Sequence, residues 1–392
     1  MEIIDTIQKY MGKISMIDDF DLNIIVEPLQ NWFAGHKRIL PWRENPRPYD
    51  VWISEIMLQQ TRVEAVKPYF ERFIQELPDV KTLAECEEDR YLKLWEGLGY
   101  YNRVRNLNAA AKQIMEDYGG IVPDEYEKLL TLKGIGHYTA GAICSIAYGK
   151  AVPAVDGNVL RVITRLTADD SDIMKQSVKN KFEEKISQLM VEQEKAGILI
   201  PSQFNQALME LGALICTPNG KPHCMECPWK EFCRARQEGN FEMLPVKSKA
   251  KQRRIEEKTV LVIRDGDKVA IHKRPQKGLL AGLYELPNVC GFINQEEVLS
   301  YVKELGCLPL RIKPLIDAKH IFSHVEWHMK GYVIFVEPTE VQKCNAKQEL
   351  LFVEAYDAKE RYAIPTAFLA YAEYMNLEIG AEAVKNSRKE NL

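Results

Sequence analysis

The stretch LLTLKGIGHYTAGA, residues 129–142, places two glycines, Gly134 and Gly136, between two segments with the apolar spacing of helices. Glycine permits a tight turn with positive φ and allows another backbone to approach closely. Amides exposed at the start of the second helix can hold a phosphate oxygen. We therefore interpret residues 129–149 as two helices joined by a phosphate-binding turn, with a plain interhelical turn as the alternative.

Further along the chain, four cysteines fall within 18 residues with the spacing Cys-x7-Cys-x2-Cys-x5-Cys: Cys216, Cys224, Cys227 and Cys233. Thiolates gathered so closely need a metal centre to compensate their charge. Zinc often uses two Cys-x2-Cys pairs separated by a longer gap, whereas this loop has one such pair, which favours an iron–sulfur cluster over zinc. The remaining cysteines are scattered, and we expect them to be ordinary core residues: Cys86, Cys144, Cys290, Cys307 and Cys344.

Composition is that of a globular protein. The 392 residues include 52 basic and 56 acidic side chains, a net charge of −4, and 46% are hydrophobic. This balance neither indicates nor excludes nucleic acid, because a local basic face is enough for binding. Lys150 interrupts the longest apolar stretch, residues 140–155, so we expect no membrane association. The N-terminus lacks the pattern of a secretory signal and the cysteines are odd in number. We therefore expect a cytoplasmic protein without disulfides, nucleoid-associated if bacterial.

The apolar period changes along the chain. Up to about residue 240, apolar residues recur at three- and four-residue steps, as in helices. A basic stretch without apolar period follows and predicts a linker, either merely solvated or in contact with a polyanion. Two segments of period two then flank Asp265-Gly266 and predict a β-hairpin. The predicted parts are an N-terminal extension (1–22), a helical part (23–240), the linker (241–258), a smaller α+β domain (259–375) and a tail (376–392).

Four further strings make the pattern specific: LPWR (residues 40–43), WISEIMLQQT (52–61), GLGYYNRVRN (97–106) and VDGNV (155–159). With the glycine turn and the cysteine loop, they resemble the helix-hairpin-helix DNA glycosylases related to endonuclease III, and in particular the MutY-type adenine DNA glycosylases. The resemblance covers roughly residues 22–375. It implies an all-helical catalytic part, comprising a six-helix barrel and an iron–sulfur cluster domain, followed by an α+β Nudix-like domain.

The same resemblance implies an activity. The family removes adenine mispaired with 8-oxoguanine, and also with guanine, from double-stranded DNA. It implies a [4Fe–4S] cluster on the four cysteines. We expect a monomer, because each domain can close its own core.

Candidate catalytic residues follow from the matched strings. Glu55 lies in an apolar segment, which would raise its pKa and keep it protonated as a general acid; a buried, hydrogen-bonded structural carboxylate is the alternative. Asp156 could simply cap a helix, whereas the resemblance makes it the carboxylate that stabilises the sugar cation. Asn158 would support the sugar and the attacking water. Tyr138 stands where relatives with lyase activity carry lysine, so we predict a monofunctional glycosylase. Lys133 does not match that position.

Residues that contact DNA also follow from the resemblance. Gln60, Thr61, Leu98 and Tyr100 match the residues that enter the duplex when adenine is extruded. By themselves, Leu98 and Tyr100 would more often be core residues. Three arginines are candidate phosphate contacts or part of a solvated basic face: Arg43, Arg103 and Arg105.

The C-terminal part resembles a Nudix fold at GLLAGLYELP, residues 278–287, but lacks the acidic helix that binds magnesium in Nudix hydrolases. The resemblance therefore implies a recognition domain. In it, Phe322, Ser323 and His324 match the loop that contacts 8-oxoguanine, and the Ser323 hydroxyl can hydrogen-bond the oxidised edge. His320, His324 and His328 recur at four-residue steps, which would place them on one strand face; a metal site there is disfavoured.

One departure and three alternatives remain. Seven residues separate Cys216 from Cys224, where the family usually has six, and Gly220 can absorb the extra residue. The alternatives are a related glycosylase for thymine mismatches or oxidised pyrimidines, a Nudix hydrolase with a DNA-binding module, and a non-catalytic iron–sulfur DNA-binding protein.

Overall fold

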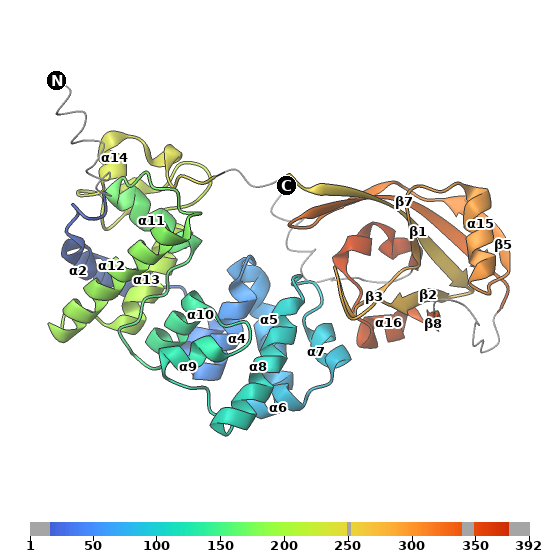
Figure 1. Ribbon diagram of the computed structural model, residues 1–392, viewed down its shortest axis with the longest axis horizontal. Helices are drawn as coiled ribbons and strands as arrows, with labels where there is room; N and C mark the ends of the chain where they lie inside the picture. Colours follow the sequence, from blue (N-terminus) through green and yellow to red (C-terminus); the bar gives the residue numbers. More distant parts are fainter. Residues whose placement is uncertain (1–15, 249–251, 339–348, 376–392) are drawn as a thin grey trace. The chain divides into compact units, whose positions relative to one another are not determined.

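A computed structural model describes residues 16–248, 252–338 and 349–375 (Figure 1). The chain folds into two compact units. Unit 1 comprises residues 1–60, 78–84 and 109–249, and unit 2 comprises residues 61–77, 85–108 and 250–392. The predicted tail and residues 1–15 lie outside the described residues. Within the described ranges, no helix is long and apolar enough to cross a membrane.

The helices that precede the sheet are η1 (Leu22–Ile25), α2 (Val26–His36), α3 (Pro41–Glu44), α4 (Pro48–Leu58), α5 (Val63–Glu76), α6 (Val80–Glu85), α7 (Glu88–Leu94), α8 (Asn102–Tyr118), α9 (Tyr126–Thr131), α10 (His137–Ala142), η2 (Ile143–Ala147), α11 (Gly157–Thr167), α12 (Gln176–Lys195), α13 (Pro201–Leu214), η3 (Cys224–Glu226), α14 (Arg234–Glu238) and η4 (Phe241–Met243). Several begin at residues suited to a helix start. Pro48 and Pro201 occupy first helical positions, where the missing amide costs no hydrogen bond. The helical character predicted from the three- and four-residue spacing is confirmed.

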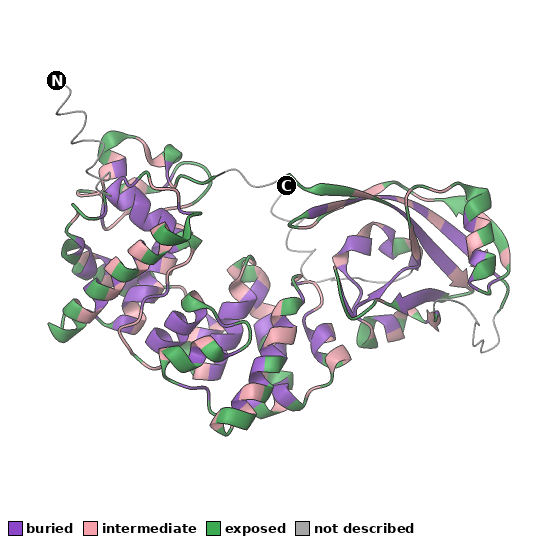
Figure 2. Ribbon diagram, viewed as in Figure 1, coloured by how far each residue is buried: buried purple, intermediate pink, exposed green. Residues whose placement is uncertain are grey.

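Unit 1 is built around α11 and α13. Their apolar side chains pack with those of α2 and α12 into one buried cluster, which also takes in Trp229 from the cysteine loop. Figure 2 shows α11 as an almost wholly buried helix. The predicted extension reaches into this cluster, because Ile17 is only 1% exposed and its amide donates to Asp169. The boundary at residue 22 was therefore too late.

Unit 2 contains the predicted α+β domain. Its further elements are β1 (Arg254–Asp265), β2 (Lys268–Lys273), β3 (Tyr284–Glu285), β4 (Asn288–Cys290), α15 (Gln295–Glu304), β5 (Pro309–Pro314), β6 (Ala318–Ile321), β7 (Val325–Val336), β8 (Leu351–Val353), α16 (Ala355–Arg361) and η5 (Thr366–Met375). The main strand order is β3-β2-β1-β7-β5, and β4, β6 and β8 pair with β1, β7 and β2. The predicted hairpin is confirmed, since Asp265 pairs with Lys268 and Gly266 has φ +56°.

Both faces of this sheet are covered. Val260 and Val262 of β1 contribute to the cluster that contains η5, whereas Leu261 and Ile263 contribute to the cluster that contains α15 (Figure 1). A strand buried on both sides reads as a continuous apolar run, which explains the sequence TVLVI. Strand β1 begins at Arg254 and not at residue 259, because its exposed first half pairs in parallel with β7 from Arg254 onward. The predicted linker was thus too long.

The predicted single helical part, residues 23–240, also needs correction. Residues 61–77 and 85–108 belong to the same compact unit as the C-terminal domain. Side chains make the connection: Lys273 Nζ of β2 lies 2.6 Å from Asp89 Oδ1, and Arg105 donates to the Ala281 carbonyl. Contacts this remote in sequence leave no trace in a local apolar period.

Candidate active site

Glu55 lies in the middle of α4 and is 5% exposed. Its Oε2 accepts a hydrogen bond of 2.7 Å from the hydroxyl of Tyr138 on α10, and that hydroxyl also lies 3.7 Å from Met209 Sδ on α13. Burial raises the pKa of Glu55 from 4.5 to about 7, the Tyr138 hydrogen bond opposes this rise, and the charge of Asp156 adds to it. The carboxyl can therefore carry a proton near neutral pH.

Asp156 caps the N-terminus of α11. Its Oδ1 accepts from the amides of Asn158 and Val159, each at 2.8 Å, and its Oδ2 accepts from Asn158 Nδ2 at 2.8 Å. Three donors converge on this side chain, so both of its oxygens act as acceptors at the helix start. The two carboxyl groups therefore occupy different surroundings, one in a buried helix and one at a helix start.

Asn158 connects this cap to the cysteine loop. Arg161 Nη1 donates to Asn158 Oδ1 at 2.9 Å, and its Nε donates to the Cys216 carbonyl at 3.0 Å. One turn later, Arg165 donates to Cys216 Sγ at 3.5 Å and to the Thr217 carbonyl at 2.8 Å. Helix α11 thus joins the acidic cap to the cysteine loop through two arginines.

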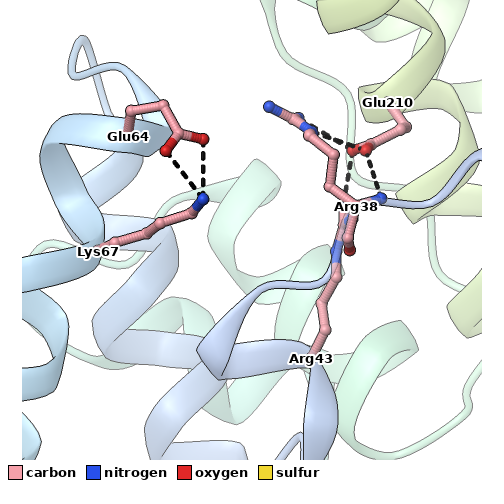
Figure 3. Close-up of polar contacts among 5 residues, drawn as sticks. All are labelled: Arg38, Arg43, Glu64, Lys67 and Glu210. Carbon is pink, nitrogen blue, oxygen red and sulfur yellow. Dashed lines mark hydrogen bonds and ion pairs between the residues drawn. The ribbon is translucent and has the colours of Figure 1, made fainter.

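A second buried carboxylate, Glu210 on α13, holds two arginines (Figure 3). It accepts from Arg38 Nε at 2.7 Å and from Arg43 Nη2 at 2.9 Å. Burial alone would raise its pKa, but these hydrogen bonds lower the pKa of Glu210 to about 2. Arg43, expected on a solvated face or on phosphate, is instead fixed inside the protein, where its charge acts on Glu55. No sequence motif pointed to Glu210.

All four predicted cysteines line one cavity of about 30 Å³, together with the basic side chains of Arg165, Lys230 and Arg236. They form no disulfide. Burial raises the pKa of Cys227 to about 12, so a thiolate there needs a compensating positive centre. Gly220 lies in the longer first gap and adopts φ +71°, a conformation that glycine accommodates without strain. Among the described residues, no three His, Cys, Asp or Glu side chains are arranged as ligands of a metal ion.

These cysteines fit an iron–sulfur cluster in their number, their shared cavity and the cationic side chains around it. Arg165 already donates to one of the sulfurs.

Unit 2 has a larger cavity of about 610 Å³. One wall comes from residues 99–106, including Tyr100, and another from the β6–β7 turn with Phe322, Ser323 and His324. The Phe322 ring is anchored between His320 and Trp327, at centroid distances of 4.6 and 4.9 Å. Ser323 and His324 are exposed, and the Ser323 hydroxyl lies 3.1 Å from His324 Nδ1. The structure therefore gathers Tyr100 and all three turn residues around one cavity.

The regular histidine spacing has a different explanation from the one expected. His320 lies on β6 and His328 on β7, which run antiparallel, while His324 lies in the turn between them. His328 pairs with Lys319, the neighbour of His320, so His320 and His328 lie on opposite faces of the sheet.

The other predicted DNA contacts are placed as follows. Gln60 and Tyr100 have φ +58° and +47°, a region that non-glycine residues rarely adopt and that is frequent at functional sites. Gln60 and Tyr100 are exposed and Thr61 is partly exposed, whereas Leu98 is 7% exposed. Gly134 has the predicted positive φ, +78°. Gly136 does not: it is the extended N-cap of α10.

Arg103 and Arg105 are occupied within unit 2. Arg103 Nη2 donates to the Leu98 and Gly99 carbonyls, at 3.0 and 3.2 Å, and Arg105 Nε donates to Glu88 Oε1 at 2.8 Å. Both were expected on phosphate or on a solvated face. Arg103 instead braces the turn that carries Tyr100, and Arg105 joins α8 to α7.

Comparison with known proteins agrees with this geometry. The model of the HhH-GPD superfamily of base excision DNA repair proteins matches residues 53–188, and a NUDIX domain model matches residues 259–374. The adenine DNA glycosylase of Buchnera aphidicola subsp. Baizongia pistaciae is 33% identical over 328 residues, which cover 83% of this chain and 90% of that protein. The adenine DNA glycosylase of Mus musculus is 34% identical over 378 residues, covering 82% and 72%. That of Schizosaccharomyces pombe is 36% identical over 325 residues, covering 67% and 68%.

A helical part with this hairpin and cysteine loop, joined to a Nudix-like domain, defines a base excision DNA repair protein of the helix-hairpin-helix superfamily. Within that superfamily, the similarity over most of the chain is to one activity. The chain belongs to the family of MutY-type adenine DNA glycosylases, which are DNA N-glycosylases.

Proposed function

We propose that the chain is a monofunctional, monomeric glycosylase that hydrolyses the N-glycosidic bond of adenine opposite 8-oxoguanine, or opposite guanine, in double-stranded DNA. The observation that carries the proposal is the state of Glu55. It is a buried carboxyl with a pKa of about 7, it is hydrogen-bonded to Tyr138, and the charge of Asp156 adds to the rise of its pKa. A group poised near neutral pH is suited to general acid catalysis. The adenine must be extruded to reach it, as for other enzymes that act on bases.

Glu55 acts first as the acid. Its proton passes to N7 of adenine. The electrons of the glycosidic bond then move to N9 of the base, which leaves as neutral adenine because N7 already carries the proton. Tyr138 holds Oε2, so Oε1 remains available to face the substrate. The resulting Glu55 carboxylate then accepts a proton from the attacking water.

Asp156 stabilises the positive charge that develops on the sugar, directly or through a covalent adduct, which is the division of labour of retaining glycoside hydrolysis. Asn158 orients it, because its amide and side-chain nitrogen both donate to that carboxylate. It also supports the sugar and the water.

The absence of lyase activity is part of the proposal. A Schiff base needs an amine next to the abasic sugar. Tyr138 supplies a hydroxyl that is already committed to Glu55, and burial raises its pKa well above the ordinary value. The hydroxyl therefore stays neutral. It makes no imine, because an imine requires an amine nitrogen.

Cys216, Cys224, Cys227 and Cys233 would hold a [4Fe–4S] cluster. When bound, it would cross-link the four thiolates and so fix the loop that contacts α11 through Arg161 and Arg165. Its role is structural, because the two carboxylates account for the glycosidic chemistry.

Recognition of 8-oxoguanine is assigned to the unit 2 cavity. Ser323 is exposed beside it and offers both a donor and an acceptor to the oxidised edge. Gln60, Thr61, Leu98 and Tyr100 would enter the duplex, and the hairpin amides around Gly134 and Gly136 would contact phosphate.

A strand-break assay tests the proposal. A labelled duplex with adenine opposite 8-oxoguanine is incubated with the protein, and breaks are measured before and after alkali. Breaks only after alkali are expected, and Glu55→Gln should abolish them. Breaks without alkali would refute the monofunctional assignment, and none in either sample would refute adenine excision.

A further inference from the structure

We propose that Lys93 is a positioning residue that clamps the helical segment 85–108 to the C-terminal domain, and so determines how strongly the protein prefers 8-oxoguanine over guanine opposite adenine. The inference rests on the proposed function and deepens it. Lys93 contacts none of the candidate DNA-binding residues and neither Glu55 nor Asp156. It acts on the cavity of unit 2 through the backbone of two segments that line it.

The Lys93 ammonium group has a full set of partners. Nζ lies 2.6 Å from Glu96 Oε2, and it donates to the carbonyls of Ala358 at 3.1 Å and Tyr362 at 3.0 Å. An ammonium has three protons, so these contacts account for all of them. The two carbonyls belong to the last turn of α16 and its C-cap, where a cation is favoured by the unpaired carbonyls and the helix dipole. Lys93 therefore fastens the end of α7 to the end of α16.

Glu96 completes the clamp. Its second oxygen, Oε1, accepts from the amide of Ile364 at 2.7 Å. Both side chains are 12% exposed, so water screens the pair much less than at the surface. Lys93 and Glu96 together hold three backbone groups of the C-terminal domain.

The clamp adjoins two of the chain segments that line the cavity. Glu96 is followed by the turn that carries Tyr100, and Ile364 is followed by Pro365, Thr366 and Ala367, which line the same cavity. A displacement at the clamp is therefore transmitted within a few residues to each side. Tyr100 and Ser323 line the same cavity from different elements, the turn after α7 and the β6–β7 turn, so their separation depends on how segment 85–108 is held to the C-terminal domain.

Other contacts across the same junction are weaker candidates. Asp89 pairs with Lys273, but these side chains are 44% and 36% exposed. Arg105 donates to the Ala281 carbonyl, but both of these residues line the cavity themselves. Lys93 and Glu96 are each 12% exposed and do not line the cavity, so they form the more buried contact across the junction.

The test compares single-turnover adenine release opposite 8-oxoguanine and opposite guanine, with each rate normalised to the active fraction from burst amplitudes. The variant is Lys93→Met combined with Glu96→Gln. Glutamine keeps an acceptor for the Ile364 amide and leaves no unpaired buried charge, so the protein should fold. The single variant Lys93→Arg should keep the wild-type ratio of the two rates, because a guanidinium can donate to the same carbonyls. The matched control is Lys67→Met, which breaks the exposed Glu64–Lys67 pair of α5 with the same three-residue spacing (Figure 3).

We expect the double variant to reduce the ratio of the two rates by about fivefold or more, the lower end of ordinary coupling between sites. A loss of folded protein would change the active fraction and leave the ratio intact. An unchanged ratio, or an equal reduction with Lys67→Met, would overturn the inference. If the wild-type protein itself shows no preference for 8-oxoguanine, the proposed recognition function fails. If the wild type shows the preference and the double variant keeps it in full, the clamp alone fails.

Discussion

The Tyr138–Glu55 hydrogen bond makes a prediction about pH. Among the influences on the Glu55 carboxyl, burial raises its pKa most, and the Tyr138 hydroxyl at 2.7 Å is the strongest influence in the opposite direction. Tyr138→Phe removes that donor and leaves the apolar surroundings in place. The pKa of Glu55 should therefore rise above its present value of about 7.

A hydrogen bond to a buried charged group contributes about 1.5–3 kcal/mol, and one pH unit corresponds to about 1.4 kcal/mol. At the lower end of this range, the falling limb of the pH–rate profile should move up by about one pH unit. The acid must be protonated to act, so the wild-type rate at pH 8 should be about one-tenth of its plateau, and the variant rate about one-half of its own plateau.

Single-turnover adenine release from pH 5 to pH 9 measures the falling limb in the wild-type protein and in the variant. Tyr148→Phe is the matched control, because its hydroxyl donates to the Val122 carbonyl and has no contact with Glu55. An unmoved limb in Tyr138→Phe would refute the assignment of Glu55 as the acid whose protonation limits the rate at high pH. A shift to lower pH would refute the sign of the Tyr138 contribution.

Three further changes test other parts of the account. Glu55 has a folded-state pKa of about 7 against 4.5 for an ordinary glutamate, so the folded protein loses stability as pH rises through this window. Glu55→Gln should therefore lower excision by about 10²-fold or more and stabilise unit 1 by about 3 kcal/mol at pH 8 but little at pH 5, measured by thermal unfolding. Cys227→Ser should reduce the iron and sulfide content per chain and lower the unfolding temperature; full iron content would contradict the ligand assignment. Ser323→Ala should lower the preference for 8-oxoguanine over guanine about fivefold, the effect of one hydrogen bond, without changing excision opposite guanine.

The residues that sequence could predict are those whose surroundings are local. Glu55 is flanked by apolar residues in its own helix, so its burial and raised pKa follow from the string VWISEIML. The positive φ of Gly134 follows from the two-glycine turn. The hairpin around Gly266 follows from period two on each side of a turn.

Sequence could not supply the partners of these residues. Tyr138 reaches Glu55 across 83 positions, Arg43 reaches Glu210 across 167, and Lys93 reaches Tyr362 across 269. An apolar period records which face of an element is buried, but not which element covers it. The ion pair of Arg43 with Glu210, and the grouping of residues 61–77 and 85–108 with the C-terminal domain, could not be predicted for this reason.

The identity of the released base decides whether the protein is an adenine glycosylase. The most direct measurement identifies the free base by mass spectrometry after incubation of cluster-loaded protein with three duplexes: adenine opposite 8-oxoguanine, a thymine mismatch and an oxidised pyrimidine. We expect the protein to release adenine from the first duplex and no base from the other two. Release of thymine or the oxidised pyrimidine, with adenine retained, would contradict it.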